Sequence, residues 1–110
     1  MRSRSERIIA DYLYHNKINY DYEKSPQNRG VRSRPDFYLT DYGVWVEYWG
    51  LVKAKDQETR SRYERRMQHK MYNYGKNGMK VISLFPDDLN DLDTAFKSKL
   101  KQATRTHVGS

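Results

Sequence analysis

The sequence predicts an α/β domain in which a mixed central sheet is flanked by helices, in the order α-β-β-β-α-β-α. Residues 34–50 alternate with period two on both sides of an Asp41-Tyr42-Gly43 turn, which is the pattern of an antiparallel hairpin. A helical stripe over roughly residues 56–74 then leads into the apolar run 79–85, which is typical of a buried strand reached through a helical crossover. Amphipathic patterns near both ends of the chain indicate outer helices.

Length and composition favour a single folded domain. We expect it to span residues 1–103 of the 110, followed by a flexible C-terminal tail over 104–110. The hydrophobic fraction, 36%, is low, but the aromatic fraction of 14% favours a folded domain over a disordered chain. The chain has no cysteine and no apolar run long enough to span a bilayer, so we expect a cytoplasmic protein without disulfides and without a membrane partner.

The charge balance favours a polyanionic partner. Twenty-one Lys and Arg against fourteen Asp and Glu give a net charge of +7, and nucleic acid is the commonest partner of such a surface. Residues 25–34 lack periodicity and contain proline and glycine, so they are predicted to form a loop. This loop carries Arg29, Arg32 and Arg34. It is suited to hold a phosphodiester backbone, although a merely solvated loop is the alternative.

The N-terminal segment predicts a helix followed by a strand. Ser3 to Glu6 has the spacing of a capping box, and apolar residues then recur at helical intervals, which predicts a helix over residues 4–15. Residues 18–24 alternate strictly, which predicts a strand with Ile18, Tyr20 and Tyr22 facing inward. Two roles are open for Glu6: it could complete the capping box, or it could belong to a metal site.

The predicted hairpin brings two carboxylates together. If Leu39 pairs with Val44, one face of the hairpin forms the core, with Phe37, Leu39, Val44 and Val46. The same register places Asp36 opposite Glu47 on the other face. Two opposed carboxylates repel each other and would destabilise the sheet, whereas a divalent cation between them removes the conflict. Mg²⁺ suits such a site because one or two carboxylates hold it and water completes its shell.

The second half of the chain predicts helix, strand and helix. The long helix begins at Asp56 or Thr59 and presents a stripe of Tyr63, Met67, Met71 and Tyr74. Gly75 and Gly78 are expected to end it. The strand Met79–Phe85 is predicted to be buried on both sides. A last helix, capped by the Pro86-Asp87-Asp88 segment, is predicted to bury Leu89, Leu92, Phe96 and Leu100.

The element order, with Pro35-Asp36, ten intervening residues and Glu47 on the third strand, resembles the core of the PD-(D/E)XK nuclease superfamily over roughly residues 3–85. The segments Pro35-Asp36-Phe37 and Glu47-Tyr48-Trp49-Gly50 are similar to those of small nuclease modules appended to some superfamily-one helicases. Holliday-junction resolvases share the broader pattern. The resemblance implies a restriction-endonuclease-like core and a metal-dependent DNA endonuclease for branched or otherwise structured DNA.

The resemblance also implies a ligand set and partners. Asp36, Glu47 and the Tyr48 carbonyl would bind Mg²⁺ or Mn²⁺, and Glu6 would contact the metal through water. DNA is the implied substrate. A homodimer is expected by analogy, because a small nuclease domain needs a second active site to cut both strands. A helicase or another repair protein is a further implied partner.

One position departs from the superfamily pattern. The standard motif has a lysine two residues after the acidic residue on the third strand, and Trp49 stands there in this chain. The helicase-linked modules instead carry a lysine in the following helix, in a pattern similar to Tyr63, Met67, Lys70 and Tyr74. The resemblance therefore implies Lys70 as the catalytic lysine, with Lys53 as the fallback. Spacing alone places Lys70 at the edge of the helical stripe and predicts an ordinary surface lysine.

Six residues are predicted to contact nucleic acid: Arg29, Arg32, Arg34, Trp49, Lys53 and Arg65. Trp49 and Trp45 could stack on unpaired bases or pack under the long helix, and packing is favoured for Trp45. A catalytically inactive basic DNA-binding module of the same fold is the main alternative function, and Trp49 is the argument for it. Charge alone also admits a ribosome- or RNA-associated structural protein. The histidines lack metal-ligand spacing and are predicted to be surface residues.

Overall fold

The computed structural model describes residues 3–26 and 33–104, and the structural statements below concern these two ranges. They form an α/β structure around a four-stranded mixed sheet with the order β1-β2-β3-β4. The strands are β1 Tyr20–Tyr22, β2 Phe37–Leu39, β3 Val44–Tyr48 and β4 Val81–Leu84. β1, β2 and β3 pair antiparallel, and β4 pairs parallel to β3. The predicted α/β class, with a mixed sheet and helices, is confirmed at this level.

The hairpin register is the one that the alternation predicts. Phe37 pairs with Val46 and Leu39 with Val44. All four side chains are fully buried. The turn between β2 and β3 depends on Gly43, whose φ of 67° lies in the left-handed region that favours glycine. This register fixes which residues of β3 face the core and which face the opposite side of the sheet.

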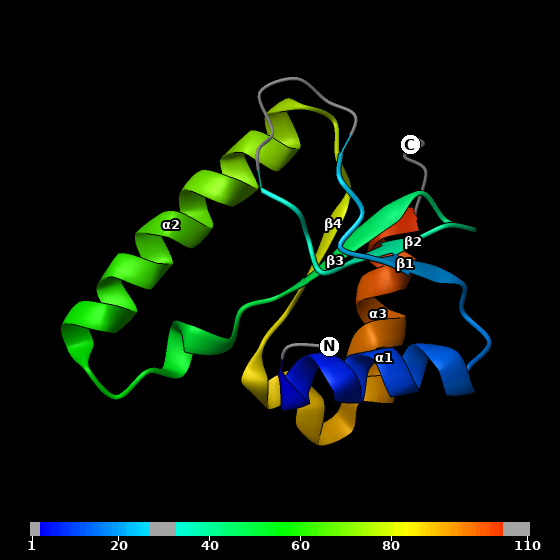
Figure 1. Ribbon diagram of the computed structural model, residues 1–110, viewed down its shortest axis with the longest axis horizontal. Coiled ribbons are helices and arrows are strands. Elements are labelled where there is room, and N and C mark those ends of the chain that lie inside the picture. Colours follow the sequence, from blue (N-terminus) through cyan, green and yellow to red (C-terminus); the bar gives the residue numbers. More distant parts are fainter. Residues whose placement is uncertain (1–2, 27–32, 105–110) are drawn as a thin grey trace.

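Two helices cover the core face of the sheet (Figure 1). They are α1 Arg4–His15 and α3 Leu92–Thr104, and they contribute Ile9, Leu13, Leu92 and Phe96 to the core. The predicted bounds of the first helix are confirmed. The last helix begins differently, because a 3₁₀ segment, η2 Pro86–Asp91, precedes it and is capped by the Asp88 carboxylate. α3 also includes Thr104, which was assigned to the tail; residues 105–110 lie outside the described ranges.

The long helix α2 Gln57–Lys76 stands apart from α1 and α3 (Figure 1). It follows β3 through a short 3₁₀ segment, η1 Gly50–Lys53, and leads into β4, which makes it the crossover connection. The Asp56 side chain caps its start by accepting the Thr59 N–H, so Asp56 is the boundary of the two predicted. Gly75 does not end the helix, which continues to Lys76. Gly78 follows the helix end, and its φ of 73° lies in the left-handed region. Tyr74 of its apolar stripe is buried, and the Ser83 hydroxyl of β4 contacts the Met71 sulfur at 3.7 Å.

β4 is less buried than its sequence predicts. Ile82 and Leu84 are buried, whereas Val81 and Ser83 are only half-buried. The physical reason is that β4 is an edge strand of the described sheet. None of the described helices has the length and apolar character that a membrane span requires.

Candidate active site

Asp36 and Glu47 meet at the end of the hairpin away from its turn. Asp36 directly precedes β2, and one further step in the observed register aligns it with Glu47 of β3. The Asp36 carboxylate is held in place by the main chain, because its Oδ2 accepts a hydrogen bond of 2.7 Å from the Tyr48 N–H. Glu47 is 6% exposed, and Asp36 is half-buried.

Two residues of α2 reach the Glu47 carboxylate. The Lys70 ammonium lies 3.6 Å from Oε2, a distance that corresponds to an ion pair rather than to a full hydrogen bond. The Tyr74 hydroxyl donates a hydrogen bond of 2.8 Å to Oε1. Lys70 and Tyr74 are four residues apart, so one face of α2 presents both donors. The lysine that the resemblance implied is therefore next to the carboxylate that it would serve.

Glu6 lies close enough to this group for its charge to act on Asp36. Its backbone N–H donates to the Ser3 hydroxyl at 3.1 Å, which forms the first half of the predicted capping box. Its carboxylate accepts a hydrogen bond of 2.6 Å from the Tyr22 hydroxyl of β1. Repulsion from Glu6 contributes to raising the pKa of Asp36. Ser3 thus caps α1 by accepting the Glu6 N–H, and the Glu6 side chain bonds to β1 rather than reaching back to Ser3.

Burial and like charge disfavour the ionised form of both carboxylates. The pKa of Asp36 is raised to about 6, mainly by burial and further by repulsion from Glu6 and Glu47, against the opposing effects of the Tyr48 N–H and of Lys70. Burial also raises the pKa of Glu47, although the Tyr74 hydroxyl and Lys70 favour its charged form. A cation at this position would relieve both penalties.

The donor atoms fit a hard divalent cation. Oxygen ligands of this kind suit Mg²⁺ or Mn²⁺. Within residues 3–26 and 33–104, Asp36 Oδ1 has no hydrogen-bond partner, and Glu47 Oε2 has only its ion pair with Lys70. The same residues include no group of three or more His, Cys, Asp or Glu that could hold a metal ion. A metal here would therefore need the Tyr48 carbonyl and water in addition to the two carboxylates.

Trp49 is not available to contact nucleic acid, which corrects its predicted role. Its side chain is 2% exposed, and its ring lies 6.3 Å from the ring of Tyr63. Its Nε1 has no hydrogen-bond partner in the part of the chain that the structure describes. Lys70 Nζ lies 5.8 Å from the centroid of the indole. Trp49 thus packs beneath α2 and supports the lysine. Trp45 is also buried, 4.5 Å from Tyr38 between ring centroids, in agreement with the favoured alternative.

The other predicted contacts to nucleic acid differ in position. Lys53, the fallback lysine, pairs with Asp87 of η2 and is engaged away from Glu47. Arg34 is exposed directly before the Pro35-Asp36 segment, and Arg65 is exposed on α2. Arg29 and Arg32 lie outside the described residues.

A cationic groove of about 410 Å³ joins α2 to the segment before Asp36. It is lined by Ser33, Arg62, Arg65, Arg66, His69 and Lys70. The sequence predicted Arg65 as a nucleic-acid contact and Lys70 as the catalytic lysine, but it did not single out Arg62, Arg66 or His69, although their spacing along the helix carried the signal. We call this surface the α2 groove. Lys70, which lines the groove, also contacts Glu47, so the groove and the carboxylate share this lysine.

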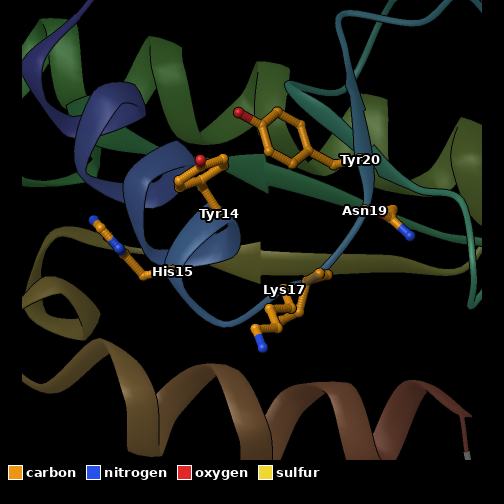
Figure 2. Close-up of a pocket in the computed structure, with 6 residues that line it drawn as sticks. Tyr14, His15, Lys17, Asn19 and Tyr20 are labelled. Atoms are coloured by element: carbon orange, nitrogen blue, oxygen red, sulfur yellow. The ribbon is translucent and has the colours of Figure 1, made fainter.

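A second hollow, of about 560 Å³, lies where α1 turns into β1. Figure 2 shows that the side chains of His15, Lys17 and Asn19 point in different directions rather than towards a common point. Tyr14 and Tyr20 complete the labelled part of its wall. No carboxylate lines it. Without converging polar groups it does not compete with the Asp36 and Glu47 site.

Comparisons of the chain with protein-family models, with curated proteins and with solved structures find no match. The function is therefore inferred from the residues themselves. Two carboxylates with raised pKa values, a lysine and a cationic groove meet at one place.

The raised pKa of Asp36 predicts a pH-dependent stability. Its folded-state pKa is about 6 and its ordinary value is 3.8, so the folded state binds this proton more tightly than the unfolded state does. The associated stability is fully present below pH 3.8 and is lost as the pH rises through 6. We expect the metal-free protein to lose about 2 kcal/mol relative to Asp36→Asn between pH 4 and pH 7.

Urea unfolding of both proteins across this pH range measures the difference. The exposed Asp21 of β1 supplies a control, because Asp21→Asn should follow the wild-type pH dependence. Parallel curves for the wild type and Asp36→Asn would contradict the assigned burial of this carboxylate.

Proposed function

We propose that this chain is a metal-dependent endonuclease with a restriction-endonuclease-like core, which hydrolyses phosphodiester bonds in branched or otherwise structured DNA. The position of Lys70 is the observation that carries this proposal. Its ammonium lies 3.6 Å from Glu47, although no lysine occupies the usual place on the strand. A lysine beside a buried and a half-buried carboxylate supplies the positive charge that phosphodiester hydrolysis requires.

The roles of the residues follow from their positions. Asp36, Glu47 and the Tyr48 carbonyl would hold Mg²⁺ or Mn²⁺. When bound, this ion would lower the pKa of a water molecule and neutralise charge on the phosphate. The Lys70 ammonium would orient the attacking water or stabilise the negative charge that develops on the phosphate. Glu6 would act through water from its position beside Asp36.

The α2 groove would guide the DNA backbone to this site. Its arginines are exposed, and the groove reaches from Arg62 to Lys70 along the helix. At 1.5 Å per residue this distance is about 12 Å, enough for successive phosphates of one strand. Arg34 is exposed on the segment that leads into Asp36. The net charge of +7 favours the same partner.

A cleavage assay tests the proposed function directly. The substrates are a four-way junction, a flap, a nicked duplex, an intact duplex and a single strand, each with Mg²⁺, Mn²⁺ or EDTA. We expect cleavage of branched DNA that either metal supports and EDTA abolishes. Binding without cleavage under every condition would instead support the inactive DNA-binding module, which the tryptophan at position 49 favours. Sedimentation on a junction tests the accompanying proposal of a homodimer.

Charge reversal in the α2 groove should weaken DNA binding without changing its sequence preference. We expect Arg65→Glu or Arg66→Glu to lower affinity for all sequences about equally, because phosphate contacts carry no sequence information. Each lost phosphate contact should reduce the slope of log affinity against log salt concentration by roughly 0.9 on duplex DNA. Fluorescence anisotropy over a salt series measures both quantities.

The matched control for this measurement is Lys101→Glu, an exposed position on α3 away from the groove. It changes the net charge by the same amount and should leave the salt slope close to that of the wild type. Equal losses in the groove variants and the control would show that only net charge matters. Wild-type affinity that does not depend on salt would exclude the nucleic-acid function.

A further inference from the structure

We propose that Tyr74 restricts Glu47 to a single metal-binding oxygen and thereby selects Mg²⁺ or Mn²⁺ over Ca²⁺. The inference rests on the metal site of the proposed function. Tyr74 touches neither DNA nor metal in this account, so it is a positioning residue that acts through Glu47.

The geometry assigns a different partner to each oxygen of the Glu47 carboxylate. Tyr74 donates to Oε1 at 2.8 Å, and Lys70 lies 3.6 Å from Oε2. Both donors come from the same helix, one turn apart, so the carboxylate cannot rotate without losing both contacts. Tyr74 is 1% exposed and cannot swing away into solvent. Tyr74 therefore engages one lone pair of Oε1 at close range, whereas Oε2 has only the longer contact with Lys70 and is the oxygen more open to a cation.

The Tyr74 hydroxyl remains a donor over the physiological pH range. Burial raises its pKa, and the charge of Glu47 raises it further. The Ser33 side chain acts in the opposite direction and lowers this pKa. Ser33 also lines the α2 groove.

The number of oxygens that Glu47 offers separates the candidate metals. Ca²⁺ takes six to eight oxygen ligands at 2.3–2.6 Å and often binds both oxygens of a carboxylate. Mg²⁺ requires near-octahedral geometry at 2.0–2.1 Å and retains several waters. A carboxylate that binds through one oxygen suits Mg²⁺. The hydrogen bond to the other oxygen disfavours the bidentate coordination that Ca²⁺ prefers.

Calorimetric titration of the full chain with MgCl₂, MnCl₂ and CaCl₂ tests this selection. Tyr74→Phe keeps the buried ring and removes only the hydroxyl, so Oε1 of Glu47 loses its hydrogen bond and becomes open to a cation. We expect the ratio of Ca²⁺ affinity to Mg²⁺ affinity to rise about tenfold, the lower end of the change when a residue that supports a metal ligand is lost. The ratio of the two affinities is the relevant quantity. Loss of the hydrogen bond also disfavours the charged form of Glu47, and this weakens the binding of both metal ions.

Tyr12→Phe is the matched control. It removes a tyrosine hydroxyl that donates to a carboxylate, Asp93, over the same 2.8 Å, but between α1 and α3. It should leave the metal ratio unchanged. If Tyr74→Phe also leaves the ratio unchanged while Mg²⁺ binding persists, this inference is wrong and the metal site stands. If the wild-type protein binds neither Mg²⁺ nor Mn²⁺, the proposed function fails, and this inference fails with it.

Difference infrared spectroscopy of the wild type reaches the same decision if Tyr74→Phe does not fold. The bands of Glu47 are assigned by comparison with Glu47→Gln. Mg²⁺ and Ca²⁺ should both give the splitting of a carboxylate bound through one oxygen. The splitting of a two-oxygen chelate with Ca²⁺ would overturn the inference.

Discussion

Replacing Lys70 by alanine should lower the rate of DNA cleavage by about 10²-fold or more. The reason is that the ammonium lies 3.6 Å from Glu47 and is held over the indole of Trp49, so its charge is positioned before the substrate arrives. The loss should fall on kcat rather than on DNA affinity, because the arginines of the α2 groove remain. Single-turnover kinetics on a junction substrate separates the two.

Two further variants sharpen this result. Lys70→Arg should restore only part of the activity, because a planar guanidinium replaces a compact point charge. Lys76→Ala removes an exposed lysine from the end of the same helix and should cleave at the wild-type rate. A fully active Lys70→Ala protein would show that this lysine is structural and that the positive charge needed for cleavage comes from another residue or from the metal.

The second large effect concerns the carboxylates. Asp36→Asn and Glu47→Gln should each abolish measurable cleavage while DNA binding stays equal or becomes tighter. Each change removes a charge that would hold the metal, and it also removes repulsion towards phosphate. Metal-free protein should become more stable at pH 7, because burial raises the pKa of both groups and their ionised forms are disfavoured. Cleavage, anisotropy and thermal unfolding measure the three effects.

Glu64→Gln is the control for these variants, because Glu64 is exposed on α2. It should leave cleavage, binding and stability unchanged. Wild-type cleavage by both Asp36→Asn and Glu47→Gln would mean that the active site lies elsewhere in the chain.

The sequence by itself determined the sheet and its register. Period-two alternation distinguishes the two faces of a strand, and a slip of one residue would turn Phe37 and Val46 away from the core. This constraint predicted the observed pairing and aligned Asp36 with Glu47. Helical and strand periodicities along the chain predicted the order of the elements, and the predicted helical crossover agrees with the parallel pairing of β4.

Element boundaries were predicted less well, because local propensity competes with packing. Gly75 costs a helix about 1 kcal/mol relative to alanine. The neighbouring Tyr74 is buried and hydrogen-bonded to Glu47, and this contact offsets such a penalty, so α2 continues past the glycine. The 3₁₀ segment η2 precedes α3, and the Asp88 carboxylate caps it by accepting the Phe85 N–H. Sequence spacing alone does not distinguish such a 3₁₀ start from an α-helical start.

Only the tertiary structure decided which residues of α2 meet the carboxylates. Helical spacing places Lys70 and Tyr74 on one face, but it does not say what that face contacts. The packing of Tyr63 on the buried ring of Trp49 helps to set the rotation of α2, and this rotation brings Lys70 to one oxygen of Glu47 and Tyr74 to the other. The same packing buries Trp49, which the sequence had suggested as a contact for bases. The large apolar surface of an indole stabilises the fold more when it packs beneath α2 than when it is exposed to solvent.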